Sequence, residues 1–289
     1  MSNLCEKLKK IFEKYDCKLN HSNLDVENQK LDIDSFPHCQ LDINEKNLKK
    51  CAIIIILFRA NNEWNILFTI RSSQLRSYPG EICYPGGQFD SKLDKNLQDT
   101  AFRETYEEIG LKKENLELIC QLCHFISPVG HYLVPFICLL KKSNLLPHSY
   151  DDTLEVFKSL KPNPKEVESI FYLPFSYILN SNFVNDRISV LRIPFKLDDS
   201  LNNFKHLLKD RINFSDGFLS RVFINFNESL FESNKMPNTP ILYGINATII
   251  LFVVLTIENE ANFKLLIENA YILETNSSLT QGFIRVLER

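Results

Sequence analysis

The stretch "GGQFDSKLDKNLQDTAFRETYEEIGL", residues 86–111, brings three glutamates and an arginine together within a few positions. Asn96, with Asp99 three residues further on, is a typical helix N-cap. Gly110 is typical of the position just beyond a helix C-terminus. The pattern therefore predicts a helix that spans residues 96–110.

On a helical wheel the side chains that must face the core share one broad side. They are Leu97, Ala101, Phe102, Thr105 and Ile109. Glu104 and Glu108 lie together at one edge of that side, because residues four apart are neighbours on a helix. Glu107 lies one step further round, and Arg103 lies beyond it, also at a spacing of four.

Clustered carboxylates at the border of a core repel one another unless a cation lies among them. Hard divalent ions prefer oxygen ligands, and Mg²⁺ commonly takes one or two carboxylates plus phosphate oxygens of a substrate. Arg103 is placed to neutralise and orient Glu107. The alternative interpretation is a solvated helix face that carries glutamates without a function.

The letters "RETYEEIGL", residues 103–111, preceded by two glycines at 86–87, resemble the box of the Nudix hydrolase family. That box reads Gly, five residues, Glu, seven residues, Arg-Glu-apolar-x-Glu-Glu-x-Gly-apolar. Thr105 occupies the first apolar position of the second half. The first half departs further from the box. Leu93 stands where the family has glutamate, and fifteen residues, not thirteen, separate Gly87 from Arg103.

The additional residues fall in the loop before Asn96, outside the predicted helix. The register of the three glutamates is therefore expected to be unchanged. Asp94 lies next to the position of the missing glutamate, and we hypothesise that it braces the loop in its place.

The stretch "LFTIRSSQLRSYPGEICYPGG", residues 67–87, is similar to an additional signature of the coenzyme A diphosphatase branch of that family. The signature reads Leu-Leu-Thr-x-Arg-(Ser/Ala), three residues, Arg, three residues, Gly, three residues, Phe-Pro-Gly-Gly. The matching positions are Leu67, Thr69, Arg71, Ser72, Arg76, Gly80, Pro85, Gly86 and Gly87. The segment "PNPKEV", residues 162–167, is also similar to one found in this branch.

This resemblance implies a Nudix fold of the α/β class, an α/β/α sandwich around a mixed sheet. It also implies hydrolysis of the diphosphate of coenzyme A or acyl-CoA to 3′,5′-ADP and (acyl-)4′-phosphopantetheine, with Mg²⁺ or Mn²⁺. By matching position, Glu104 and Glu108 would be metal ligands, while Arg103 orients a catalytic Glu107. Such ions neutralise a diphosphate and activate water.

Two arginines before the box, Arg71 and Arg76, are candidates to bind phosphates bidentately, and Gly87 is a candidate for contact with the substrate. Ordinary surface charge is the alternative for both arginines. Glu166 is a candidate general base supplied by a distant loop, with a solvated loop glutamate as the alternative.

Two other functions stay open. The first is a Nudix diphosphatase for a dinucleotide, a nucleotide sugar or an RNA cap. The formal net charge of −3 and the lack of a basic, aromatic-interleaved tract argue against nucleic acid. The second is a Nudix module that binds a ligand without catalysis. Inactive copies typically lose box glutamates, whereas all three remain in this chain.

The rest of the chain predicts three parts. Residues 1–46 are expected to form an N-terminal helix and a polar arm, and residues 47–190 the Nudix catalytic core. Apolar residues at helical spacing predict a short amphipathic helix over residues 4–15, and the polar, Asn/Asp-rich residues 16–47 resemble a tether laid over a domain surface.

Residues 191–289 are expected to be a C-terminal extension with an irregular insert and helices that pack on the core. Residues 181–240 are polar and Asn/Ser-rich, which predicts loops with at most short strands, whereas residues 242–260 and 261–274 are each expected to form a helix, the first of them buried. Within the core, residues 49–73 and 116–140 each show the pattern of a β-hairpin. Strands alternating with helices indicate a mixed sheet covered on both faces.

No apolar run reaches the roughly 18 residues of a membrane span, and the first residues lack a secretory signal. An intracellular location is expected. The resemblance suggests the peroxisome, but the chain ends "RVLER" instead of Ser-Lys-Leu, so the cytosol and mitochondrion stay open. Cys120 and Cys123 are expected to be packed thiols. The oligomeric state is open.

Overall fold

Two long apolar runs form adjacent strands at the centre of one sheet. β1 (Lys49–Ala60) and β2 (Glu63–Arg71) pair antiparallel as the predicted hairpin, with Ala60 opposite Glu63. Their branched, apolar side chains are buried along almost the whole of both strands, as befits strands covered on both faces. The computed structural model describes residues 2–16, 48–60, 62–122, 124–126, 131–141, 157, 159–179, 188–194, 218–225 and 241–258.

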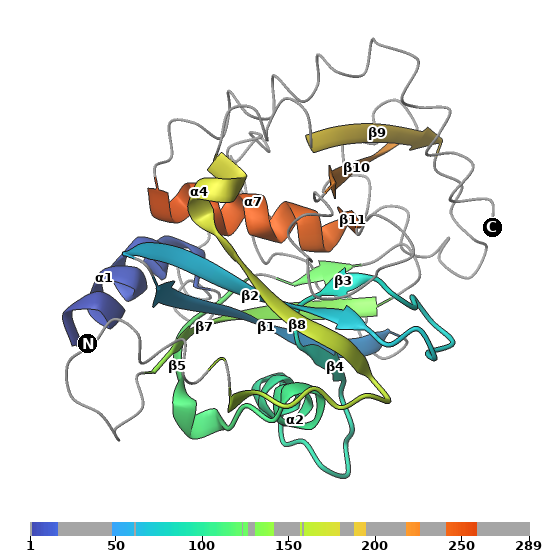
Figure 1. Cartoon of the computed structure of the whole chain (residues 1–289), viewed down its shortest axis with the longest axis horizontal. Coiled ribbons are helices and arrows are strands. Elements are labelled where there is room, and N and C mark those ends of the chain that lie inside the picture. Colours follow the sequence, from blue (N-terminus) through green and yellow to red (C-terminus); the bar gives the residue numbers. More distant parts are fainter. Residues whose placement is uncertain are drawn as a thin grey trace, which may run out of the picture. The chain divides into compact units, whose positions relative to one another are not determined.

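Eight strands form this sheet, whose main path runs β3–β2–β1–β7–β5 (Figure 1). The other pairs join β4 to β1, β6 to β7 and β8 to β2. β1 and β7 pair parallel and the remaining pairs are antiparallel, so the predicted mixed sheet is confirmed. The remaining bounds are β3 (Ile82–Cys83), β4 (Gly86–Gln88), β5 (Leu116–Gln121), β6 (Phe125–Ile126), β7 (His131–Leu140) and β8 (Val167–Pro174).

Helix α2 (Leu97–Ile109) lies on one face of the sheet, and α1 (Ser2–Phe12) lies on the other side, next to β5 (Figure 1). The apolar side chains of α2 join those of β1 and β7 in one core. A 3₁₀ turn, Glu13–Tyr15, extends α1, so the predicted helix over residues 4–15 is confirmed. Cys120 on β5 is a buried, packed thiol, as expected, and Cys123 lies outside the described residues.

The chain divides into two compact units, residues 1–177 and 178–289, and α4 (Phe175–Leu179) spans the division. In the second unit β9 (Ile188–Pro194), β10 (Phe218–Asn225) and β11 (Ile241–Tyr243) form an antiparallel sheet in the order β11–β10–β9. Loops with at most short strands were expected for residues 181–240, whereas β9 and β10 have seven and eight residues.

Helix α7 (Ile245–Glu258) contacts β10 and β11, which confirms the predicted buried helix in this region. The predicted polar arm, residues 16–47, lies outside the described residues except for Asp16, and so does the predicted helix at 261–274. In the part of the chain that the structure describes, every helix is too short or too polar to cross a membrane.

Candidate active site

Both ends of α2 are fixed by the residues that the sequence indicates. The side chain of Asn96 accepts a hydrogen bond from the backbone N–H of Asp99 at 2.9 Å. Gly110 adopts a left-handed conformation with φ of 71°, and its N–H donates to the carbonyl of Tyr106. These caps confirm the helix bounds and fix the register of the three glutamates.

Glu108 is a buried carboxylate, with 4% of its surface exposed. Its Oε2 accepts a hydrogen bond from the N–H of Gly86 at 3.0 Å. Burial raises the pKa of Glu108 to about 8, and the negative charges of Glu104 and Glu166 add to this shift. Among the described residues, no lysine or arginine forms an ion pair with Glu108.

The carboxylate of Glu104 lies directly against the backbone of Gly87. A Cβ atom at Gly87 would collide with the Glu104 carboxylate, approaching Oε2 to 2.5 Å. A side chain at position 87 would therefore displace the Glu104 carboxylate from its place beside the backbone. Burial raises the pKa of Glu104, and the neighbouring charges of Glu107 and Glu166 act in the same direction, while Arg103 opposes them.

Arg103 connects the loop before α2 with two of the glutamates. Its Nε and Nη2 donate to the two carboxylate oxygens of Asp94, at 2.8 and 2.9 Å. Nη2 also donates to the carbonyl of Gln88 at 3.1 Å. Nη1 lies 2.9 Å from both Glu104 Oε1 and Glu107 Oε2. The five N–H groups of the guanidinium thus face five acceptor atoms, which fixes its direction.

Asp94 accepts two further hydrogen bonds, from the N–H of Asp90 and from the Thr100 hydroxyl, both at 2.9 Å. The hydrogen bonds from Arg103 hold the pKa of Asp94 at about 2, well below its usual range. This geometry agrees with the hypothesis that Asp94 braces the loop. Its effect on activity stays a prediction.

The remaining candidates lie at different distances from the glutamates. Arg71 is the last residue of β2, and its charge reaches Glu108, where it opposes the rise in pKa that burial causes. Glu166 is half-buried, and its charge reaches both Glu104 and Glu108. Arg76 is exposed in the loop between β2 and β3, residues 72–81. The structure therefore brings Arg71 and Glu166 near the glutamates and leaves Arg76 on the surface.

The donor atoms suit a hard divalent cation. Within the described ranges, no three His, Cys, Asp or Glu side chains gather closely enough to bind one ion. Two carboxylates at the border of the core, Glu104 and Glu108, are enough for Mg²⁺ or Mn²⁺ when water and phosphate oxygens complete the shell. Burial raises the pKa of both carboxylates, and the positive charge of Arg103 offsets this rise only in part at Glu104, as that of Arg71 does at Glu108.

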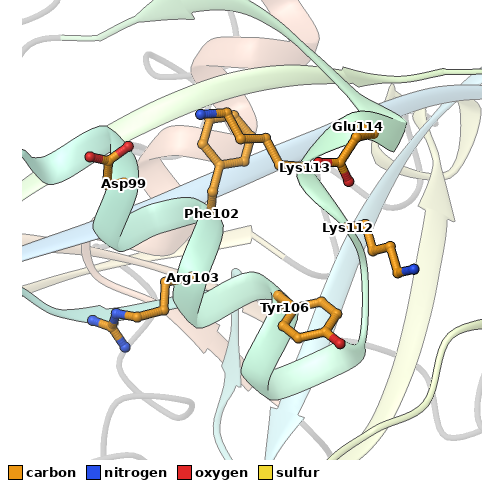
Figure 2. Close-up of a pocket in the computed structure, with 7 residues that line it drawn as sticks. All are labelled: Asp99, Phe102, Arg103, Tyr106, Lys112, Lys113 and Glu114. Carbon is orange, nitrogen blue, oxygen red and sulfur yellow. The ribbon is translucent and has the colours of Figure 1, made fainter. Parts of the chain in front are cut away.

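A surface hollow of about 350 Å³ lies on another side of α2 (Figure 2). It is lined by Asp99, Phe102, Arg103, Tyr106, Lys112, Lys113 and Glu114. Figure 2 shows the Arg103 guanidinium pointing away from Lys112 and Lys113, and the Lys113 ammonium lies 5.1 Å from the centre of the Phe102 ring. Neither Glu104 nor Glu108 lines the hollow, and its cations do not converge, so it is not the carboxylate site, although Arg103 borders both.

The sequence profile of the NUDIX domain matches residues 48–192, half of the chain. The chain therefore belongs to the Nudix family, and its mixed sheet with flanking helices is the Nudix fold. Among solved structures, the Ap4A hydrolase of Caenorhabditis elegans superposes with a TM-score of 0.33 at 17% identity. That superposition covers 46% of this chain and 84% of the hydrolase.

Two relatives carry more specific names. The peroxisomal coenzyme A diphosphatase ndx-8 of Caenorhabditis elegans is 31% identical over 154 residues, which are 51% of this chain and 59% of that protein. The peroxisomal coenzyme A diphosphatase NUDT7 of Mus musculus is 28% identical over 131 residues, 45% of this chain and 49% of that protein. The chain thus spans about half the length of these relatives.

Proposed function

We propose that this protein hydrolyses the diphosphate bond of coenzyme A or acyl-CoA in the presence of Mg²⁺ or Mn²⁺. The products would be 3′,5′-ADP and (acyl-)4′-phosphopantetheine. The observation that carries the proposal is the placement of Glu104 and Glu108 against the backbone of the two glycines, Gly87 and Gly86. Two partly desolvated carboxylates in this position suit a cation that also binds phosphate.

The chain's own residues have separate roles in this proposal. Glu104 and Glu108 hold the metal ion, which when bound neutralises the diphosphate and makes water a better nucleophile. Arg103 Nη1, 2.9 Å from Glu107 Oε2, fixes the direction of this carboxylate, so that it can position the attacking water. Glu166 is the candidate that accepts the proton of this water, because its charge reaches both ligand glutamates. Water's oxygen bonds to one phosphorus as the bridging P–O bond breaks.

The choice of coenzyme A rests on two kinds of support. The signature over residues 67–87 is similar to that of the coenzyme A diphosphatase branch, and two relatives bear that name. Arg71 lies at the end of β2 within reach of the charge on Glu108, a suitable position for a residue that binds substrate phosphate. The contact of Arg76 and Gly87 with the substrate, and a peroxisomal location, stay predictions.

Hydrolysis assays on the full chain test the proposal. Coenzyme A, acetyl-CoA, NADH and ADP-ribose are each incubated with Mg²⁺, and the products are separated by chromatography. We expect the two coenzyme A species to be cleaved. Replacing a metal ligand removes several kcal/mol of transition-state stabilisation, so Glu108→Gln should lower kcat/KM by about 100-fold or more.

Glu114→Gln is a matched control, since Glu114 is an exposed glutamate outside the site. It should leave kcat/KM within about twofold of the wild type, as most surface substitutions do. Equal activity of Glu108→Gln and the wild type would contradict the metal assignment. Cleavage of ADP-ribose or NADH without cleavage of coenzyme A would contradict the substrate assignment. Binding without hydrolysis of any of the four compounds would favour the non-catalytic alternative.

A further inference from the structure

The segment 161–167, whose last residue is the first of β8, is bonded to the end of β2. The backbone N–H of Ser72 donates to the carbonyl of Glu166 at 2.8 Å, beyond the last register pair of β2 and β8. The buried hydroxyl of Ser72 donates to the carbonyl of Pro164 at 3.1 Å. The same hydroxyl oxygen accepts a hydrogen bond from the backbone N–H of Gln74 at 3.4 Å. Ser72 therefore fixes the start of the β2–β3 loop to this segment.

The same segment caps the C-terminal end of α2. The last carbonyls of a helix lack partners within the helix. The N–H of Asn163 donates to the carbonyl of Glu108 at 2.8 Å, and the N–H of Lys161 donates to the carbonyl of Ile109 at 3.0 Å. The turn of α2 that carries the buried carboxylate is thus bonded directly to residues 161–163.

The segment has its own internal bonds, all of which meet at Asn163. Its carbonyl accepts from the N–H of Glu166 at 2.9 Å and from the N–H of Val167 at 2.8 Å. Its side-chain oxygen accepts from the N–H of Lys165 at 3.2 Å. A turn closed at three points transmits the position of one end to the other, because few of its dihedral angles are free.

We propose that residues 161–167 form a bracket that fixes the β2–β3 loop relative to α2, and that Ser72 is the positioning residue on the loop side. The inference rests on the proposed function, because it concerns the alignment of two halves of one site. Glu104 and Glu108 lie on α2, whereas Arg71 and Arg76 lie at the end of β2 and in the β2–β3 loop. The bracket sets the position of the arginines relative to the carboxylates.

This role predicts a separation between substrate binding and metal binding. Ser72→Ala removes the hydroxyl that bonds to Pro164, while the backbone bonds that cap α2 remain. Since a neutral hydrogen bond contributes about 1 kcal/mol, KM for coenzyme A should rise roughly fivefold. The affinity for Mn²⁺, measured by calorimetry without substrate, should stay within about twofold because the carboxylates keep their helix. Ser72→Thr keeps a hydroxyl and should restore KM.

Ser73→Ala is the matched control. The bond at Ser73 runs from its backbone N–H to Glu168 at 3.2 Å, and alanine keeps that N–H. Its KM should equal that of the wild type. Asn163→Ala tests the bracket from the other side, because it removes the side-chain acceptor of the Lys165 N–H. It should raise KM in the same way, and it replaces Ser72→Ala as the test if Ser72→Ala does not fold.

Hydrogen–deuterium exchange of the full chain supplies a readout that needs no substrate. Ser72→Ala should speed exchange in peptides that cover residues 72–81 and 161–167, and leave β5 unchanged. The proposed bracket would be overturned if Ser72→Ala changed neither the exchange rates nor KM. It would also be overturned if Ser72→Ala weakened Mn²⁺ binding as much as it raised KM. If the wild type hydrolyses none of the diphosphates, the proposed function fails, and the exchange result still decides whether the bracket exists.

Discussion

The residues just before α2 show how a single position decides which side chain braces the helix. Counting along the family pattern places Leu93 where a glutamate is expected, yet Leu93 is 65% exposed. Its neighbour Asp94 is 6% exposed and receives both Nε and Nη2 of Arg103. Asp94, one residue beyond the position that counting from Gly87 assigns to the family's glutamate, therefore supplies the acidic contact to Arg103 in this chain. The sequence suggested this role but could not establish it without the turn geometry.

The pairing of Asp94 with Arg103 predicts a pH-dependent loss of stability. The folded-state pKa of Asp94 is about 2, below the ordinary value of 3.8, so ionised Asp94 stabilises the fold above about pH 4. That contribution is lost as the pH falls through 2. The shift corresponds to about 2 kcal/mol, so Asp94→Asn should lower the free energy of unfolding by about that amount at pH 7. Urea unfolding should show the deficit shrinking between pH 4 and pH 2.

Asp90→Asn is the control in the same loop, because the Asp90 side chain bonds to the N–H of Lys92 and not to Arg103. At pH 7, Asp90→Asn should lower the free energy of unfolding by less than Asp94→Asn does. A deficit of Asp94→Asn that is the same at every pH would mean that the ion pair does not stabilise the fold. Asp94→Ala should also weaken hydrolysis without abolishing metal binding, because neither metal-ligand candidate is removed.

At the scale of the element, local sequence patterns predicted where helices form, but they did not predict which strands the elements pack against or pair with. The caps Asn96 and Gly110 define α2 in sequence and structure alike. The amphipathic pattern of α1 likewise gives a helix, but nothing in its own residues indicates that it packs on β5. The parallel pairing of β1 with β7 joins residues about eighty positions apart, and such pairings depend on tertiary packing, not on local propensity.

Because α1 packs on β5, we predict that the apolar side chains of α1 hold this helix on the sheet. Phe12 is fully buried, and the Sγ of Cys120 on β5 lies 3.8 Å from its carbonyl oxygen. Truncating a buried phenylalanine removes apolar contacts and leaves a cavity, so Phe12→Ala should cost about 3 kcal/mol or more. Denaturant unfolding of the full chain measures this difference.

The ion pair between Lys9 and Glu117 provides the contrast on the same helix. The Lys9 ammonium lies 3.0 Å from Glu117, and both side chains are exposed. Exposed pairs contribute little because solvent screens them, so Lys9→Ala should cost about 0.5 kcal/mol or less. A larger effect of Lys9→Ala than of Phe12→Ala would show that charge, and not burial, holds α1 to the sheet.

At the scale of the whole molecule, the glutamate cluster was the most predictable part of the candidate site. Residues four apart on one helix must lie together, so Glu104 and Glu108 could be paired from sequence alone. The meeting of Ser72, Pro164 and Glu108 joins three segments that are far apart in the chain, and no local spacing encodes it. The strands β9 and β10 were underestimated because their polar, Asn-rich surroundings resemble loops.

The extent of the self-contained core is the last prediction. The sequence places the end of the core at residue 190, which falls inside β9. β9 pairs with β10 in the second unit, whereas β8 pairs with β2, and the Trp64 ring lies 6.5 Å from that of Phe175 at the start of α4. A chain ending at residue 179 keeps all pairs of the first sheet. It should therefore unfold cooperatively, and it should bind Mn²⁺ within about twofold of the full chain, because both metal-ligand candidates and their described contacts belong to the first unit.

A chain that ends at residue 160 is the matched negative control, because it loses β8 and the segment 161–167 and leaves β2 without a partner on one side. It should fail to fold, as judged by circular dichroism. A third chain, ending at residue 190, separates the two boundaries. If it folds and binds Mn²⁺ while the chain ending at 179 does not, residues 180–190 belong to the core, and the division of the chain by its contacts does not mark the limit of the folding unit.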